Sequence, residues 1–348
     1  SSDLETFIDL NLMNEEPCTL FPLPDSEELI WFSERTGWAH LYLYDLTTGK
    51  LKHPITEGQW LVREVVGFDV DRRELYFQAA GRVAERDPYY REVCRVNIDS
   101  GKVHTLASSD HDYIIHKPGT LTPFFAAVFG RDTTGASGLA PSGNYFVTTR
   151  SRVDQVSVSE LRNREGRVVM ELAVADTGSL PANWKWPEPV KLLAADGKTD
   201  IYGVVFRPTD FDPNKQYSVI DYALGLSIVT FVPKNSFFTS VINAAAYLPA
   251  AAWAELGFIV VIIDGRGTPY RNKAFHDESY GQLHTASNLE DHVAGIKQLA
   301  ERYPYMDLER VGISELIGSS SGAISAMVNH SDFYKVGVSG VTHDSRLS

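Results

Sequence analysis

The residue pattern of this chain changes at one place, the aromatic and proline-containing stretch Trp184–Pro189. Before it, short β-type runs alternate with turn residues and show very little helical periodicity. After it, apolar strands alternate with longer helical segments, which is typical of a parallel sheet covered by helices on both faces. The 348 residues are enough for about two domains. We therefore expect an all-β domain over residues 1–177 and an α/β domain over residues 178–348.

The strands expected in the first domain follow one another at roughly ten-residue spacing, as in sandwiches or propeller blades. They cover residues 29–33, 40–44, 62–68, 74–79, 92–97, 102–106, 144–149, 155–160 and 168–172. One strand-and-turn unit occurs twice in the sequence: Tyr42–Asp45 with Gly49-Lys50 resembles Cys94–Asn97 with Gly101-Lys102. Internal repetition favours propeller blades, and a plain antiparallel meander remains the alternative.

In the second domain the pattern predicts a hairpin, three further strands and two helices. The hairpin joins residues 190–194 and 201–207, the strands cover 217–221, 258–264 and 310–313, and the helices cover 237–256 and 288–303. The apolar residues of the last helix fall on a single face, and they are Leu289, Val293, Ile296, Leu299 and Ala300. We expect His292 of this helix to lie at the surface or to support a site from behind.

Charge and hydropathy exclude two classes of partner. The chain has 32 Lys and Arg against 45 Asp and Glu, a net charge of −13 that repels an extended phosphate backbone, so we expect no nucleic acid. The longest apolar run, Phe258–Ile263, is far shorter than the roughly twenty residues of a bilayer span, so we expect no membrane span. The first residues show no basic and apolar export signal, which leaves the compartment unassigned.

The sequence gives no support for a metal or a cofactor. Cys18 and Cys94 lack the paired spacing of zinc sites, and we expect them to be small apolar core residues. The turn Asp264–Gly267 lacks the full glycine pattern of a dinucleotide site and the lysine of a P-loop. Trp184 and Trp186 are expected to pack at the domain junction.

The string Gly318–Gly322 is the strongest candidate for chemistry. It reads Gly-Ser-Ser-Ser-Gly between an expected strand and an expected helix, which matches the nucleophile elbow of α/β-hydrolases. The pattern nominates Ser320 as a nucleophile, whose neighbouring backbone N–H would stabilise an oxyanion. The alternative is a loop that caps a helix and has no chemical role.

Longer strings in both domains resemble one known family. Trp31–Tyr42, Asp87–Tyr90 and Ser142–Val147 are similar to the later propeller blades of the prolyl oligopeptidase superfamily (peptidase family S9), on its dipeptidyl peptidase IV branch. Five strings of the second domain are similar to the α/β-hydrolase domain of that family, and they are Gly203–Pro208, Gly257–Val261, Asp264–Thr268, Arg310–Ile313 and Asp332–Ser339. The resemblance covers almost the whole chain. It implies part of a β-propeller followed by a doubly wound α/β-hydrolase domain that is incomplete at its C-terminus.

The resemblance also implies an activity and partners. Members of the family are serine peptidases that cleave short peptides near proline through an acyl-enzyme. We therefore expect a peptide substrate or peptide ligand, no cofactor, and a homodimer formed through the hydrolase domain.

Three departures from the family pattern affect the catalytic groups. The position seven residues after Arg310, which carries the nucleophile in the family, holds Ile317. An ungapped count back from Val232 places Leu224 at the position of the tyrosine that binds the oxyanion, and Tyr222 lies two residues away. By resemblance, the Asp and His of the triad come later than His343 and Asp344.

These departures lead to the hypothesis that the chain lacks a working catalytic site. One alternative is an active hydrolase with Ser320 as a displaced nucleophile, once the missing C-terminal part is present. The other is a non-catalytic binding scaffold. Whether the chain is an enzyme is left open by the sequence.

Overall fold

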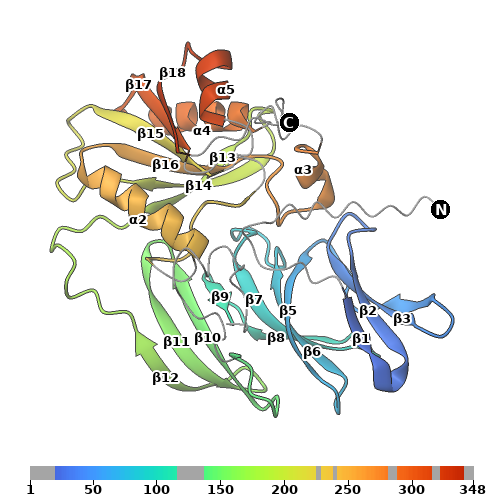
Figure 1. Ribbon diagram of the computed structural model, residues 1–348. Coiled ribbons are helices and arrows are strands. Elements are labelled where there is room, and N and C mark those ends of the chain that lie inside the picture. Colours follow the sequence, from blue (N-terminus) through green and yellow to red (C-terminus); the bar gives the residue numbers. More distant parts are fainter. Residues whose placement is uncertain are drawn as a thin grey trace. The chain divides into compact units, whose positions relative to one another are not determined.

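The computed structural model describes residues 20–115, 137–224, 229–237, 241–280, 288–315 and 322–340, and these form two compact units (Figure 1). Within the described ranges, unit 1 takes the residues up to Arg152, then Ser157–Ala175 and Tyr270–Ala274, and unit 2 takes the others. Each unit has its own buried apolar core.

The described part of unit 1 contains three four-stranded sheets in which strands that follow one another along the chain are neighbours. The first contains β1 (Leu20–Leu23), β2 (Glu28–Ser33), β3 (His40–Asp45) and β4 (Lys50–Pro54), with the short 3-10 helix η1 (Pro24–Ser26) between β1 and β2. The second contains β5 (Leu61–Asp69), β6 (Glu74–Ala80), β7 (Arg91–Asn97) and β8 (Val103–Ala107). The third contains β9 (Asp112–Ile114), β10 (Tyr145–Arg152), β11 (Gln155–Asn163) and β12 (Val168–Val174). The predicted propeller-like, all-β architecture is confirmed.

The repeated unit predicted from the sequence is also a repeat in three dimensions. The turns β3–β4 and β7–β8 end on Gly49 and Gly101, which both have φ +66°. Their N–H groups donate to the carbonyls of Asp45 (2.8 Å) and Asn97 (3.0 Å). The side chains of Asp45 and Asn97 each accept the backbone N–H three residues later. A left-handed φ is the reason why both turns need glycine.

Cys94 lies in the apolar core shared by the first two sheets of unit 1, among Leu43, Leu75, Phe77 and Val96. Burial raises the pKa of its thiol to about 12, so the thiol is neutral at ordinary pH. The prediction of a small core residue is confirmed for Cys94, whereas Cys18 lies outside the described residues.

The described part of unit 2 is built on a six-stranded, mostly parallel sheet in the order β13-β14-β16-β15-β17-β18. Its strands are β13 (Glu188–Leu193), β14 (Asp200–Phe206), β15 (Tyr217–Ala223), β16 (Ile259–Asp264), β17 (Met306–Glu315) and β18 (Tyr334–Ser339). The hairpin β13–β14 is antiparallel, and β14 is antiparallel to β16. The strands from β16 to β18 run parallel. The predicted α/β architecture is confirmed.

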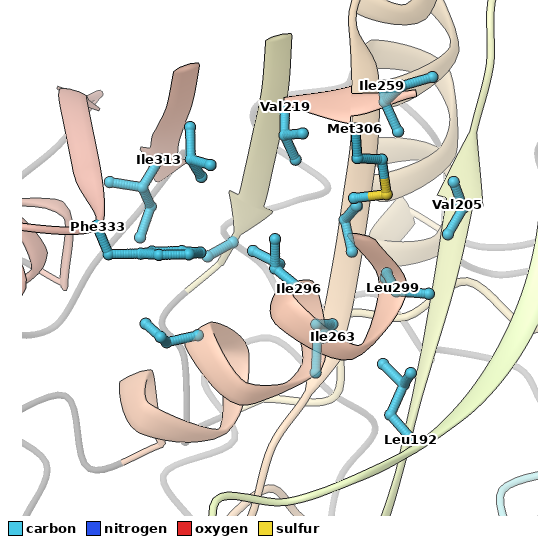
Figure 2. Close-up of a cluster of buried hydrophobic side chains, with 14 of the residues drawn as sticks. Leu192, Val205, Val219, Ile259, Ile263, Ile296, Leu299, Met306, Ile313 and Phe333 are labelled. Atoms are coloured by element: carbon cyan, nitrogen blue, oxygen red, sulfur yellow. The ribbon is translucent and has the colours of Figure 1, made fainter. Parts of the chain in front are cut away.

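The described ranges contain four α-helices. They are α2 (Val241–Glu255), α3 (Lys273–Asp277), α4 (Leu289–Arg302) and α5 (Gly322–Asn329). Figure 2 shows Ile296 and Leu299 of α4 turned toward the sheet residues Val219 and Ile263. A Cβ on Gly295 would come within 2.8 Å of Ile263, so the glycine lets α4 lie close to the sheet.

Candidate functional site

Three buried acids lie at or near the carboxyl ends of the central parallel strands of unit 2. Asp221 is two residues from the end of β15, Asp264 ends β16 and Glu315 ends β17, and all three are buried. In open α/β sheets, ligands bind outside the carboxyl ends of the strands. This edge of the sheet is therefore where a functional site is expected.

The Glu315 carboxylate occupies the start of helix α5. Its Oε2 accepts the backbone N–H of Ala323 at 3.1 Å. Burial raises the pKa of Glu315, while the N–H groups of Ala323 and Gly322 act in the opposite direction. The first N–H groups of a helix are the usual partners of an anion, because they have no acceptor within the helix. Here a side chain of the same chain supplies that anion.

The candidate nucleophile Ser320 and the alternative position Ile317 both lie outside the described residues. The elements on either side of them are described. Strand β17 ends at Glu315 and helix α5 begins at Gly322, so the Gly-Ser-Ser-Ser-Gly string joins a strand to a helix. The roles of both residues remain predictions.

Leu224 and Tyr222 are both buried at the end of β15. The Tyr222 hydroxyl donates to the carbonyl of Ala245 in α2 at 2.9 Å, and its ring packs edge-on against Phe231 and Trp253. Burial raises the pKa of Tyr222 to about 12. Leu224 has no polar group to offer, and the Tyr222 hydroxyl is already used to hold α2.

Asp221, His292 and Tyr334 form a buried hydrogen-bonded group that the sequence did not reveal. The Nδ1 of His292 lies 3.0 Å from both carboxylate oxygens of Asp221, and the Tyr334 hydroxyl donates to Asp221 Oδ2 at 2.7 Å. Burial lowers the pKa of His292, but Asp221 outweighs it, so that the pKa lies above its ordinary value. The second ring nitrogen of His292, Nε2, is buried and has no hydrogen-bond partner among the described residues.

Of the two positions expected for His292, the one at the surface was wrong, because its side chain is only 1% exposed. The other, support of a site from behind, stays a prediction. The helical spacing could have indicated that His292 is buried. His292 follows Leu289 by three residues and precedes Ile296 by four, which places it on the apolar face of α4.

The turn Asp264–Gly267 is held by contacts inside unit 2. The Asp264 carboxylate accepts the backbone N–H groups of Phe231 (2.6 Å) and Val232 (3.2 Å), and burial raises its pKa to about 6. Arg266 forms an ion pair with Asp291 at 2.9 Å. A carboxylate and its N–H donors make a structural connection within unit 2.

The structure describes only some of the remaining residues that the sequence analysis named. Trp184 and Trp186 both pack against Phe237, with ring centroids 6.3 and 5.7 Å apart. Asp332 is exposed between α5 and β18, and His343 and Asp344 lie outside the described residues. Within the described ranges, no group of three or more His, Cys, Asp or Glu side chains is arranged to hold a metal ion.

Sheets that follow one another as propeller-type blades, together with a mostly parallel sheet covered by helices, define a class of two-part α/β-hydrolase-type proteins. Comparison with known families agrees. Residues 5–131 match the family described as the dipeptidyl peptidase IV N-terminal region, and residues 246–343 match the prolyl oligopeptidase family. The chain belongs to the prolyl oligopeptidase family, on its dipeptidyl peptidase IV-like branch.

Individual relatives are distant and longer. Human dipeptidyl peptidase 8 is 26% identical over 361 aligned residues, which cover 92% of this chain and 36% of the relative. Dipeptidyl-peptidase 5 of Porphyromonas gingivalis is 23% identical, with 89% of this chain and 40% of the relative covered. A crystal structure from Bacteroides ovatus, described as a dipeptidyl aminopeptidase IV, superimposes with a TM-score of 0.71 at 25% identity and covers 92% of this chain and 43% of that one. The chain thus spans well under half the length of these relatives.

Among the described residues, no helix has the length and apolar character needed to cross a bilayer.

Proposed function

We propose that this chain is a peptide-binding member of the prolyl oligopeptidase family that has lost hydrolytic activity, with propeller blades over residues 1–177 and a hydrolase-type domain over residues 178–348. The observation that carries the proposal is the Glu315 carboxylate at the start of α5. The family membership supports a peptide as the class of ligand.

Acyl transfer needs free N–H donors where negative charge develops, and removing one such donor typically lowers kcat by about 10²–10³-fold. The helix that follows the Gly-Ser-Ser-Ser-Gly string already gives its first N–H groups to Glu315. An ionised carboxylate in this buried position also repels a second anion nearby. On the neighbouring strand, Leu224 has no donor and Tyr222 is bonded to Ala245. These defects are independent: Glu315 holds the N–H groups that directly follow Ser321, whose own N–H is the expected oxyanion donor after Ser320, and the neighbouring strand supplies no second donor.

An active hydrolase with Ser320 as nucleophile is the second candidate. It is favoured by the position of the Gly-Ser-Ser-Ser-Gly string between β17 and α5, since a strand, a sharp turn and a helix form a nucleophile elbow. This function also needs an Asp and a His, which by family resemblance would come from sequence after His343.

Reaction with a fluorophosphonate probe distinguishes the two candidates, because the probe labels only an activated serine. We expect no labelling of the chain under conditions in which an active serine hydrolase, added as a control, is labelled fully. Labelling that disappears in Ser320→Ala would contradict the proposal and establish the second candidate.

Peptide binding is tested separately by calorimetry with peptides that carry a Gly-Pro N-terminus. We expect saturable binding, and chromatography of the same samples should show the peptide uncleaved. A protein that neither binds such peptides nor reacts with the probe would contradict the peptide-binding part of the proposal.

A further inference from the structure

Glu74 of β6 is shared by two arginines that come from different sheets of unit 1. Its Oε2 accepts a hydrogen bond from Nη2 of Arg164 and lies 3.5 Å from Nε of Arg95. Arg95 belongs to β7 in the second sheet, whereas Arg164 lies in the turn between β11 and β12 of the third sheet. Nη1 of Arg95 also donates to the backbone carbonyl of Arg164 at 3.2 Å. The two guanidinium groups therefore meet at one carboxylate.

The charges of this cluster do not balance. The side chains of Arg95 and Glu74 are only 8% and 13% exposed, and a charge that is removed from water needs an opposite charge. Asp69, which Arg164 also attracts, is bonded to Nη1 of Arg72 at 2.6 Å. Three arginines thus face two acids. One positive charge is left in excess, within a chain whose net charge is −13.

The neighbours of the cluster supply no further negative charge. The residues directly across from Arg95 on β6 and β8 are Tyr76 and His104. Glu165 follows Arg164 in the turn, but it is exposed and forms no ion pair with either guanidinium within the described ranges. An anion from outside the chain would balance the excess charge.

Both arginines also have an N–H group that such an anion can use. The Nε atoms of Arg95 and Arg164 are buried, and neither has a hydrogen-bond partner among the residues that the structure describes. Buried polar groups are nearly always hydrogen-bonded in native proteins, so each Nε needs an acceptor. The Arg164 side chain is 24% exposed, which leaves one side of the pair open to solvent. Guanidinium groups bind oxyanions such as phosphate through their planar sets of N–H donors.

We propose that Arg95 and Arg164 together bind one small oxyanion, of the phosphate or sulfate type, beside Glu74. The ion accepts hydrogen bonds from the two Nε groups and balances the excess positive charge. It also connects the β11–β12 turn of the third sheet to β7 of the second sheet. The site lies in unit 1 and does not depend on the proposed function.

Calorimetric titration of the whole chain with sodium phosphate tests the site, with sodium chloride at the same ionic strength as the reference. We expect saturable binding of phosphate to one site and no such binding of chloride. Arg164→Gln should weaken phosphate binding by about tenfold to a hundredfold, because it removes a charged donor. Arg167→Gln is the matched control, since it makes the same charge change at an exposed position of the same turn, and it should change nothing.

A change at Glu74 should act in the opposite direction. Glu74→Gln removes the negative charge that repels the bound ion, so we expect phosphate to bind about tenfold more tightly. If Glu74 only held the two arginines in place, the same variant would bind phosphate no better than the parent chain. Circular dichroism shows whether each variant is folded, and the urea midpoint of Glu74→Gln should rise more with phosphate than that of the parent.

Three results would overturn the proposal. The parent chain could bind phosphate and sulfate no better than chloride, Arg164→Gln could bind phosphate as tightly as Arg167→Gln does, or folded Glu74→Gln could bind it no more tightly than the parent.

Discussion

The Asp221 carboxylate connects three elements of unit 2 through one residue. It belongs to β15, accepts the Tyr334 hydroxyl from β18 and is paired with the imidazole of α4 residue His292. All three side chains are buried. A carboxylate in such a place is stable only while its partners satisfy it, since an unpaired buried charge is costly. The group therefore links the edge of the sheet to the helix above it.

Removing this carboxylate should be much more harmful than removing one of its partners. We expect Asp221→Asn to lower the free energy of unfolding by about 3–5 kcal/mol, because it breaks a buried ion pair. Tyr334→Phe removes a single hydrogen bond to the same oxygen and should cost about 1.5–3 kcal/mol. Urea unfolding of the two variants measures both values. Equal and small losses would show that Asp221 does not hold these elements together.

Two raised pKa values predict a decline of stability as the pH rises. Burial raises the pKa of Asp264 from 3.8 to about 6 in the folded chain, and the pKa of His292 is raised above 6.5 by Asp221 despite burial. Each group binds its proton more tightly when folded. Its contribution is therefore fully present below the unfolded pKa and is lost as the pH rises through the folded pKa.

His292→Gln isolates the histidine in this decline. Glutamine can still donate to Asp221 but does not titrate, so the loss of stability above pH 6.5 should be smaller in the variant than in the parent chain. The urea midpoint as a function of pH gives the comparison. Identical slopes in both proteins above pH 6.5 would contradict the assignment to His292.

Among the elements, α4 shows what hydrophobic periodicity can predict, namely the extent of a helix and the face that it buries. The sequence predicted a helix over 288–303, and the structure has Leu289–Arg302. The predicted apolar face covers the sheet, as Ile296 and Leu299 show in Figure 2. Short elements such as β9, with three residues, carry too little pattern to be found in this way. Their existence depends on a neighbouring strand, which no local spacing reveals.

The buried face of α4 should dominate its contribution to stability. Ile296 is fully buried against the sheet, so Ile296→Ala should lower the free energy of unfolding by about 2–5 kcal/mol through lost burial and the cavity left behind. Glu301→Ala, on the exposed side of the same helix, should change it by less than about 0.5 kcal/mol. Denaturant unfolding monitored by circular dichroism measures both. A loss below about 1 kcal/mol for Ile296→Ala would mean that the helix is not held by this face.

At the scale of the whole molecule, the architecture was largely predictable because it depends on repeated local signals. The change at Trp184–Pro189 and the paired turns at Gly49 and Gly101 both recur in the structure. The candidate site was less predictable. His292 meets Asp221 across 71 positions of sequence, and Glu315 meets Ala323 only after the chain has turned from a strand into a helix. Contacts made by tertiary folding leave no spacing in the sequence from which they can be deduced.

The Glu315 carboxyl has a consequence for the evolutionary history of this chain. If the proposed function holds, a descendant that acquired a serine at position 317 would still carry an acid on the N–H groups of the following helix, so that mutation alone would bring no catalytic advantage. Replacing Glu315 first would instead remove the helix cap and weaken folding before any activity could be selected. Under the proposed function, neither order gives an intermediate that selection rewards, so lineages that inherit this glutamate are expected to keep it.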